Sequence, residues 1–467
     1  MYALQPTALG RLLDVYPEYA TTSALDDLRA RELRRLDEAG HVYLDYTGAS
    51  LYASSQIERH AWLLLGSVLG NSHSTSPAST HTGELVASCR RRILEHFRAD
   101  PDEYELVFTA NASQALKLVG ESYPFEPGDE LLLTFDNHNS VNGIREFDRA
   151  HGARTRYVPV VPPDLRVDER ALEASLRDRS PGRHHLFAYP AQSNFSGVQH
   201  PLEWIELAHR HGWDVLLDAA AFVPTNRLDL SLVHPDWVAL SFYKMLGYPT
   251  GVGALIARRE ALAQLHRPWF AGGTIAVASV QADRHVPAAG AEGFEDGTLD
   301  FTNIPAVAIG LDLIESIGID TIHTRVRCLT GWLLDGLLAL EHSNGTPLVA
   351  LYGPAGLDRR GGTVTVNFRD RDGLVIDHAR VERLAAEHRI SIRTGCFCNP
   401  GAGELALGLE RGELVRCFER SDCRLDYEEF RRCIDGKSTG AARVSLGWAS
   451  NLDDVEAFLA FARELLR

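Results

Sequence analysis

Lysine is the rarest charged residue in this sequence. The 467-residue chain carries 47 basic residues, but only three of them are lysines, namely Lys117, Lys244 and Lys437. Arginine therefore serves wherever a general cation is needed. Because an arginine cannot form a Schiff base, each remaining lysine is a candidate for chemistry that requires an amine.

Other features that the sequence lacks exclude several classes of protein. No apolar run reaches the roughly 18 residues that span a bilayer, and the first twenty residues lack the pattern of a signal peptide. The net charge of −16 makes the surface a poor match for nucleic acid or anionic lipid. No two cysteines have C-x-x-C spacing, so we expect no metal site. We predict a cytoplasmic protein that binds neither nucleic acid nor membrane.

Short apolar segments alternate with helical patterns over most of the chain. The expected strands cover 42–44, 106–109, 130–134, 185–188, 215–217, 237–240 and 252–256. The expected helices between them cover 54–69, 84–98, 113–121, 140–151, 168–177 and 201–211. Strands that alternate with helices indicate an α/β fold with a mostly parallel sheet and helices on both faces.

The two ends of the chain have a different pattern of expected helices and strands. Residues 24–38 have the spacing of an exposed amphipathic helix, and a long helical stretch covers about 305–342. Short strands follow at 362–367, 391–393 and 443–446, with helices at 379–388 and 452–466. We divide the chain into a helical arm (1–40) that packs with the small domain, a large domain (41–305) and a smaller α+β domain (306–467).

Lys244 and Asp218 are the first candidates for chemistry. Lys244 follows an apolar segment and precedes a glycine-rich turn, where a solvated surface cation is not expected. Asp218 ends another apolar segment, which is where ligands bind in open α/β sheets. A pyridine cofactor that acts as an electron sink needs a carboxylate at its ring nitrogen and a lysine at its aldehyde. A surface lysine and an N-cap aspartate are the alternatives.

Two further segments have the composition of functional loops. The turn at 109–113 joins a strand to a helix with small residues, so backbone N–H groups and the Ser113 hydroxyl can approach a phosphate. The segment 393–401 carries Cys396 and Cys398 between glycine and proline, and the neighbouring Arg393 favours a reactive thiolate. A redox pair and half of a metal site are the alternatives for the two cysteines.

Together these motifs resemble a known family. The sequence is similar to the cysteine-desulfurase-like domain of molybdenum cofactor sulfurases, in the class V aminotransferase branch of the fold type I enzymes that use pyridoxal 5′-phosphate (PLP). The resemblance covers about 41–450, and the matching stretches include YLDYTGASLY, VFTANASQALKLVGE, VLLDAAAFVPTNRLDLS, SFYKMLGYPTG and RTGCFCNPG. It implies a mostly parallel seven-stranded sheet in the large domain, which binds PLP, and a smaller α+β domain that carries the cysteine loop.

The resemblance also implies a PLP site. Lys244 would form the Schiff base, Asp218 would hold the pyridine nitrogen, and His138 would stack on the ring. Asn194 would lie near the phenolic oxygen and the substrate. The residues implied around the phosphate are Ala112, Ser113, Ser241, Tyr243 and, from the other subunit of a homodimer, Thr298.

The implied reaction is cysteine desulfuration. Arg443 would grip the α-carboxylate of L-cysteine, with Arg393 as a second cation. Cys398 would take the substrate sulfur as a persulfide, and alanine would leave. The molybdenum cofactor and another biosynthetic molecule are both open as the sulfur acceptor. The alternatives are another class V reaction (a β-lyase, epimerase or aminotransferase acting on another amino acid) and a scaffold without activity.

The sequence departs from the family pattern in three places. Gly403 stands where the cysteine loop often has a further cysteine, and Ala221 stands where many desulfurases have glutamine. The chain ends at Arg467, whereas eukaryotic sulfurases carry a further C-terminal domain that presents the sulfur acceptor. Of the other lysines, Lys437 is interpreted as a solvated or phosphate-facing charge and Lys117 as structural.

Overall fold

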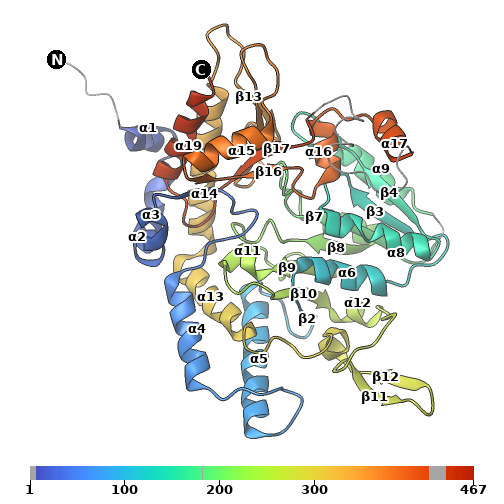
Figure 1. Cartoon of the computed structure of the whole chain (residues 1–467). Coiled ribbons are helices and arrows are strands. Elements are labelled where there is room, and N and C mark those ends of the chain that lie inside the picture. Colours follow the sequence, from blue (N-terminus) through green and yellow to red (C-terminus); the bar gives the residue numbers. More distant parts are fainter. Residues whose placement is uncertain (1–6, 181, 420–437, 467) are drawn as a thin grey trace.

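The computed structural model describes residues 7–180, 182–419 and 438–466. Its centre is a seven-stranded sheet in the order β2-β10-β9-β8-β7-β3-β4 (Figure 1). The strand β10 runs antiparallel to its neighbours, and the remaining pairs are parallel. The bounds are β2 Tyr104–Thr109, β3 Glu130–Thr134, β4 Arg154–Val158, β7 His185–Pro190, β8 Asp214–Asp218, β9 Trp237–Ser241 and β10 Gly253–Arg258. The predicted mostly parallel seven-stranded sheet is confirmed.

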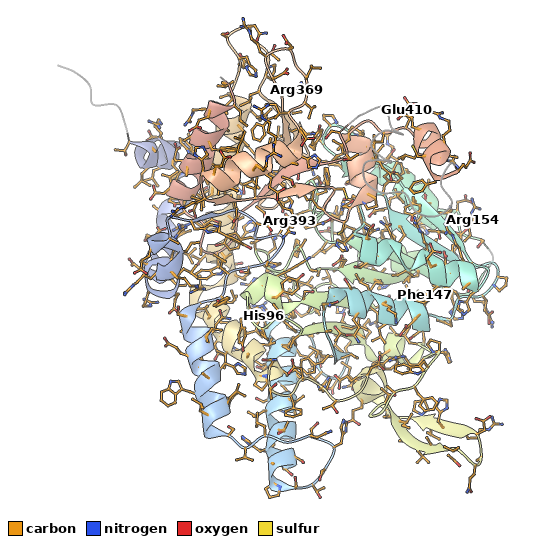
Figure 2. The ribbon with its side chains drawn as sticks, in the orientation of Figure 1. His96, Phe147, Arg154, Arg369, Arg393 and Glu410 are labelled. Atoms are coloured by element: carbon orange, nitrogen blue, oxygen red, sulfur yellow. The ribbon has the colours of Figure 1, made fainter. Side chains whose placement is uncertain are left out.

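The membership of this sheet differs from the prediction at one strand. The segment predicted at 42–44 forms β1 (Val42–Tyr43), which pairs with β15 (Ile390–Ser391) in a separate two-stranded sheet. The edge strand β4 takes its place in the large sheet, and Arg154 lies at the periphery of the molecule (Figure 2). The prediction missed β4 because an edge strand is only half buried, and its sequence RTRYV lacks the apolar run of a central strand.

Both faces of the large sheet are buried. Leu131 and Leu133 of β3 pack in one apolar cluster, whereas Leu132 between them packs in the other. This alternation places one cluster on each face, as the period of two in a strand requires. The helices of this part are α4 Ser54–Gly66, α5 Pro77–His96, α6 Ala112–Ser122, α7 Asn139–Asn142, α8 Arg145–Ala150, α9 Glu169–Arg177, α10 Trp204–Arg210, α11 Phe242–Leu246 and α12 Arg259–Ala263.

A second, antiparallel sheet lies in the C-terminal part of the chain. Its strand order is β13-β14-β17-β16, with bounds Val349–Tyr352, Thr363–Phe368, Ala441–Ser445 and Arg393–Gly395. In this sheet Arg443 is paired with both Thr365 and Arg393. The helices around it are α13 Ile304–Ile317, α14 Ile319–Leu338, α15 His378–Glu387, α16 Pro400–Ala406, α17 Arg411–Glu419 and α19 Leu452–Glu464. The single helical stretch predicted at 305–342 is two helices, because Gly318 between them has a φ of 85°.

The N-terminal segment packs on these C-terminal helices. It contains α1 Ala8–Val15, a 3-10 helix Pro17–Thr22, α2 Ala24–Glu32 and α3 Arg34–Glu38. The exposed helix predicted at 24–38 is wrong in two respects, because it is divided and because α2 buries Arg29. The Arg29 guanidinium pairs with Asp454 of α19 and lies 2.8 Å from Asp37. A buried partner so far away in the chain is not visible in helical spacing.

Two elements extend from the body of the molecule. The helices α4 and α5 form one projection, and the hairpin β11–β12 (Ile275–Ser279 and Arg284–Pro287) forms another (Figure 1). Large apolar side chains are exposed on both, including Trp62, Leu65 and Val280. Among the described helices, none has both the length and the apolar character needed to cross a membrane.

Candidate active site

The candidate site lies at one edge of the large sheet. Asp218, the last residue of β8, is paired with Ala239 of β9, and Lys244 lies in α11 directly after β9. Gly253 at the start of β10 opposes both Ser241 and Thr109, so the ends of β9 and β2 meet at the same edge. The carboxyl ends of the strands therefore bring together the candidate residues, which is the usual ligand position in open α/β sheets.

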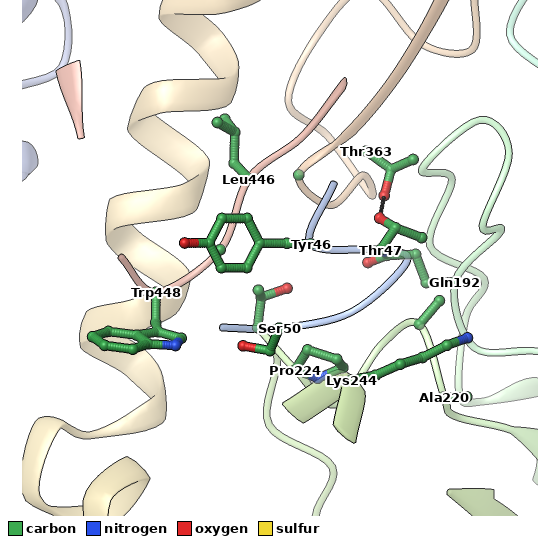
Figure 3. Close-up of a pocket in the computed structure, with 14 residues that line it drawn as sticks. Tyr46, Thr47, Ser50, Gln192, Ala220, Pro224, Lys244, Thr363, Leu446 and Trp448 are labelled. Carbon is green, nitrogen blue, oxygen red and sulfur yellow. Dashed lines mark hydrogen bonds between the residues drawn. The ribbon is translucent and has the colours of Figure 1, made fainter. Parts of the chain in front are cut away.

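A cavity of about 170 Å³ opens at this edge. It contains every residue that was predicted to contact the cofactor within one chain. The lining is Asn111, Ala112, Ser113, Leu116, His138, Ser140, Pro190, Gln192, Asn194, Asp218, Ala220, Ala221, Ser241, Tyr243 and Lys244. A second cavity of about 20 Å³ adjoins it and shares Lys244 and Gln192 (Figure 3). There the hydroxyls of Thr47 and Thr363 lie 2.7 Å apart.

Lys244 is placed so that its amine favours the neutral form. Burial lowers the pKa of Lys244 below its ordinary value, and the positive charge of Arg443 acts in the same direction. Asp218 and Cys398 partly oppose this lowering of the pKa. A neutral amine is the form that acts as a nucleophile or as a general base.

Asp218 and His138 approach the cavity from neighbouring elements. Asp218 Oδ1 accepts a hydrogen bond of 3.0 Å from the Ala220 N–H. The Nδ1 of His138 accepts a bond of 3.1 Å from the Ser140 N–H at the start of α7, so a neutral imidazole carries its proton on Nε2. Burial lowers the pKa of His138, although Asp218 partly opposes the effect. The surroundings of His138 therefore favour the neutral imidazole more than water does.

The start of α6 brings hydrogen-bond donors to one side of the cavity. The Ala112 N–H donates to Ser241 Oγ at 2.8 Å, and the hydroxyls of Ser113 and Ser140 lie 2.6 Å apart. A Cβ on Gly253 would lie 2.5 Å from the Cα of Asn111, so only glycine allows β10 to approach this turn so closely. Backbone N–H groups and hydroxyls at the positive end of an 11-residue helix suit a phosphate.

The two predicted carboxylate-binding arginines share one carboxylate, that of Asp45. Arg443 Nη2 donates to Asp45 Oδ1 at 3.0 Å. Arg393 donates to Asp45 Oδ2 from Nε at 3.0 Å and from Nη2 at 2.6 Å. Burial lowers the pKa of the Arg443 guanidinium, and Asp45 opposes that effect. Arg393, the first residue of β16, lies on the side of the small sheet that faces the large sheet (Figure 2).

The cysteine loop is hydrogen-bonded to residues beside the cavity. Both Cys396 and Cys398 are exposed. The Cys398 carbonyl accepts a hydrogen bond of 2.7 Å from the Asn139 N–H, next to His138. Cys398 raises the pKa values of both Lys244 and Arg443 against the effect of burial. The predicted nucleophile therefore lies within electrostatic reach of the amine.

Three candidates lie elsewhere or outside the described part. Thr298 lines a separate cavity of about 200 Å³ with Thr109 and Gly251, and its role toward another subunit stays a prediction. Lys117 is exposed and pairs with Glu121. Lys437 lies outside the described residues.

Three polar residues of this site were not predicted from the sequence. Asp45 lies in the stretch YLDYTGASLY, which was noticed only as a family motif. Gln192 is buried, lines both cavities, and its Oε1 accepts a bond of 3.1 Å from Gln199. Asn399 follows Cys398 and is fully buried. In the sequence, these three residues are marked only by their position in segments that contain other candidate site residues. No group of three or more metal-ligating side chains occurs in the described ranges.

Comparisons with known proteins agree with this arrangement. The chain is 39% identical to the molybdenum cofactor sulfurase of Bos taurus, in an alignment that covers 94% of this chain and 51% of the relative. It is 36% identical to the molybdenum cofactor sulfurase of Arabidopsis thaliana, in an alignment that covers 94% of this chain and 57% of the relative. The chain thus spans about half the length of the curated relatives that it matches.

Solved structures show the same fold. A cysteine desulfurase from Thermococcus onnurineus superposes with a TM-score of 0.76 at 23% identity, covering 94% of this chain and 97% of that one. The cysteine desulfurase CsdA from Escherichia coli superposes with a TM-score of 0.74 at 18% identity, covering 95% and 98%. The Aminotransferase class-V family matches residues 42–458. With the Lys244–Asp218 cavity at the sheet edge, this match shows that the chain belongs to the aminotransferase class-V family.

Proposed function

We propose that this protein is a PLP-dependent cysteine desulfurase that transfers the sulfur of L-cysteine to Cys398 and releases L-alanine. The observation that carries the proposal is that one sheet-edge cavity is lined by Lys244 and Asn194, and that Asn194 is hydrogen-bonded to the cysteine loop through the Phe397 carbonyl at 2.7 Å. The names of the relatives, molybdenum cofactor sulfurases, support the same class of chemistry.

The residues of the cavity fit PLP. Lys244 would hold the aldehyde, Asp218 the pyridine nitrogen, and the start of α6 the phosphate, with His138 against the ring. PLP, when bound, supplies a ring system that accepts the electron pair released at the substrate Cα. The aldehyde, the pyridine nitrogen and the phosphate of PLP thus each find a group of matching charge or donor character in this chain.

The chain's own residues then divide the remaining tasks. Arg443, with Arg393 beside it, binds the substrate α-carboxylate. Lys244 takes the Cα proton, for which its lowered pKa is suited. The Cys398 thiolate attacks the substrate sulfur, so an S–S bond forms as the C–S bond breaks. The sulfur loses two electrons, the former Cβ gains them and a proton, and the products are the Cys398 persulfide and alanine.

We also propose a homodimer. The exposed apolar residues Trp62 and Leu65 on α4 and Val280 on the hairpin β11–β12 support a second copy as the partner that covers them. Thr298 would reach the second active site from this side. The name of the relatives makes the molybdenum cofactor the first sulfur acceptor to test.

The test is turnover of L-cysteine by the PLP-loaded full chain. With dithiothreitol as reductant, we expect sulfide and alanine in equal amounts, and Cys398→Ala should abolish sulfide release. Without reductant, a mass spectrum of the Cys398 peptide should show one added sulfur atom. Formation of pyruvate and ammonia, with sulfide release unchanged in Cys398→Ala, would instead identify a β-lyase.

A further inference from the structure

Asn399 makes three buried hydrogen bonds directly beside the predicted nucleophile. Its side chain is fully buried. Nδ2 donates to the Asp136 carbonyl at 2.6 Å and to Asn194 Oδ1 at 2.9 Å. Oδ1 accepts from the Ala402 N–H at 3.3 Å and thereby caps α16. One side chain thus joins the cysteine loop to two segments of the large domain.

The backbone of the loop is held at two further points. Asn194 Nδ2 donates to the Phe397 carbonyl at 2.7 Å, and the Asn139 N–H donates to the Cys398 carbonyl at 2.7 Å. A Cβ on Gly401 would lie 1.9 Å from the Phe135 carbonyl oxygen, so the loop is pressed against the end of β3.

This conformation is not one that the loop adopts freely. Phe397 and Cys398 have φ values of 56° and 55°, in the left-handed region that non-glycine residues disfavour. Such residues cost of order 1–3 kcal/mol each and persist only when the surroundings impose them. The bonds of Asn399, Asn194 and Asn139 are therefore what keeps the thiol in place.

The same contacts reach the arginine assigned to the substrate carboxylate. Arg443 Nη1 donates to the Asn194 carbonyl at 3.0 Å, and its guanidinium lies 4.7 Å from the centre of the Phe397 ring. Asn194 therefore touches both the cysteine loop and the carboxylate-binding arginine.

We propose that Asn399 is a positioning residue for the Cys398 thiol, whose loop it holds against Asn194 of the cavity lining for sulfur transfer. This inference rests on the proposed desulfurase function. Asn399 increases the rate at which the Cys398 thiolate attacks the substrate sulfur. It does not change the rate at which Lys244 removes the Cα proton. Asparagine is needed because its two N–H donors serve two oxygens at once, whereas an aspartate has none to offer.

The test separates the two half-reactions in the PLP-loaded chain. The variants are Asn399→Asp and Asn399→Ser, with Asn344→Asp at an exposed position as the matched control. Exchange of the Cα hydrogen of L-alanine in D2O reports Lys244, and sulfide release from L-cysteine reports Cys398. Because a misplacement of about 1 Å can cost 10²-fold in rate, we expect sulfide release to fall by about 100-fold in Asn399→Asp. Alanine exchange should stay within about threefold of the parent rate, the same pattern as in Cys398→Ala.

The rate of Cys398 alkylation is a third readout, which does not depend on the proposed function. Loosening of the loop should raise the rate of Cys398 alkylation by iodoacetamide at least fivefold in Asn399→Asp, and not in Asn344→Asp. Sulfide release within threefold of the parent in both Asn399 variants, or an equal loss of exchange and sulfide release, overturns the positioning role. If the parent chain releases no sulfide, the proposed function fails, and the alkylation rate alone then decides whether Asn399 holds the loop. If the Asp variant does not fold, the Ser variant decides by the same ratios.

Discussion

Asp45 lies 3.0 Å from Arg443, with its Oδ1 facing Nη2 of a guanidinium that is almost completely buried. The other oxygen of the same carboxylate is bonded to Arg393. Two cations and one anion leave a single positive charge at this corner of the site. That charge matches the one α-carboxylate of an amino acid substrate.

Asp45→Asn should therefore destabilise the protein and make its stability depend on added carboxylate. Removing one partner of a buried ion pair costs about 3–5 kcal/mol, because the remaining charge is left uncompensated. Acetate or L-alanine should recover part of the loss by pairing with Arg443. Thermal unfolding with and without acetate measures both effects. An unchanged melting temperature, or equal stabilisation of the parent and the variant by acetate, contradicts the prediction.

Lys244→Arg should retain a basic side chain and lose the activity. Arginine supplies neither a Schiff base nor a proton acceptor, and general-base catalysis alone contributes about 10²–10⁴-fold. We expect sulfide release to fall by at least about 10³-fold. The matched control is Lys117→Arg, because Lys117 is exposed on α6 and pairs only with a helix neighbour, Glu121, among the contacts described. Turnover of the Lys244 variant at the parent rate would mean that the amine has no role.

The half-buried His323 should make stability depend on pH. Burial lowers the pKa of His323 below its ordinary value of 6.5, and its Nδ1 donates to Asn226 Oδ1 at 3.0 Å. As the pH falls through 6.5, the unfolded chain takes up a proton that the folded chain refuses, so stability decreases. The stability of His323→Gln relative to the parent should therefore improve between about pH 7.5 and pH 5.5. Urea unfolding at both pH values measures the gap, and a constant gap contradicts the assignment.

The pair Arg29–Asp454 should fasten the N-terminal segment to α19. Both side chains are buried, so Asp454→Asn should cost about 3–5 kcal/mol of unfolding free energy. The control is Asp320→Asn, which breaks an exposed pair of 2.8 Å with Arg227 and should cost at most about 1 kcal/mol. Chemical unfolding of the two variants compares them directly. Equal losses would show that burial of the pair is irrelevant.

The sequence predicts the parts of the fold that carry their own local signal. Strands β8 and β9 are apolar and end in Asp218 and Ser241, so both the strands and the position of the site can be expected. Strand β4 carries no such signal, because its burial depends on a neighbouring strand and not on its own composition. The division of the helix at Gly318 likewise follows from one backbone angle.

The polar contacts of the site could not be predicted in this way. Asp45 and Arg443 are 398 residues apart, and Asn399 and Asn194 are 205 apart. No periodicity connects such positions, and only the packing of the small sheet on the large domain brings them together. A family motif can indicate that Asp45 matters, but the partner that gives it a role is visible only in three dimensions.

The left-handed backbone of Phe397 and Cys398 has a consequence for the delivery of sulfur. About 1–3 kcal/mol of strain at each residue offsets part of what the asparagine hydrogen bonds contribute. Releasing the loop from this conformation therefore needs less free energy than the number of its hydrogen bonds suggests, because the backbone strain is relieved at the same time. Under the proposed desulfurase function, a persulfide on Cys398 would then reach a large acceptor by movement of the loop, without the acceptor entering the cavity.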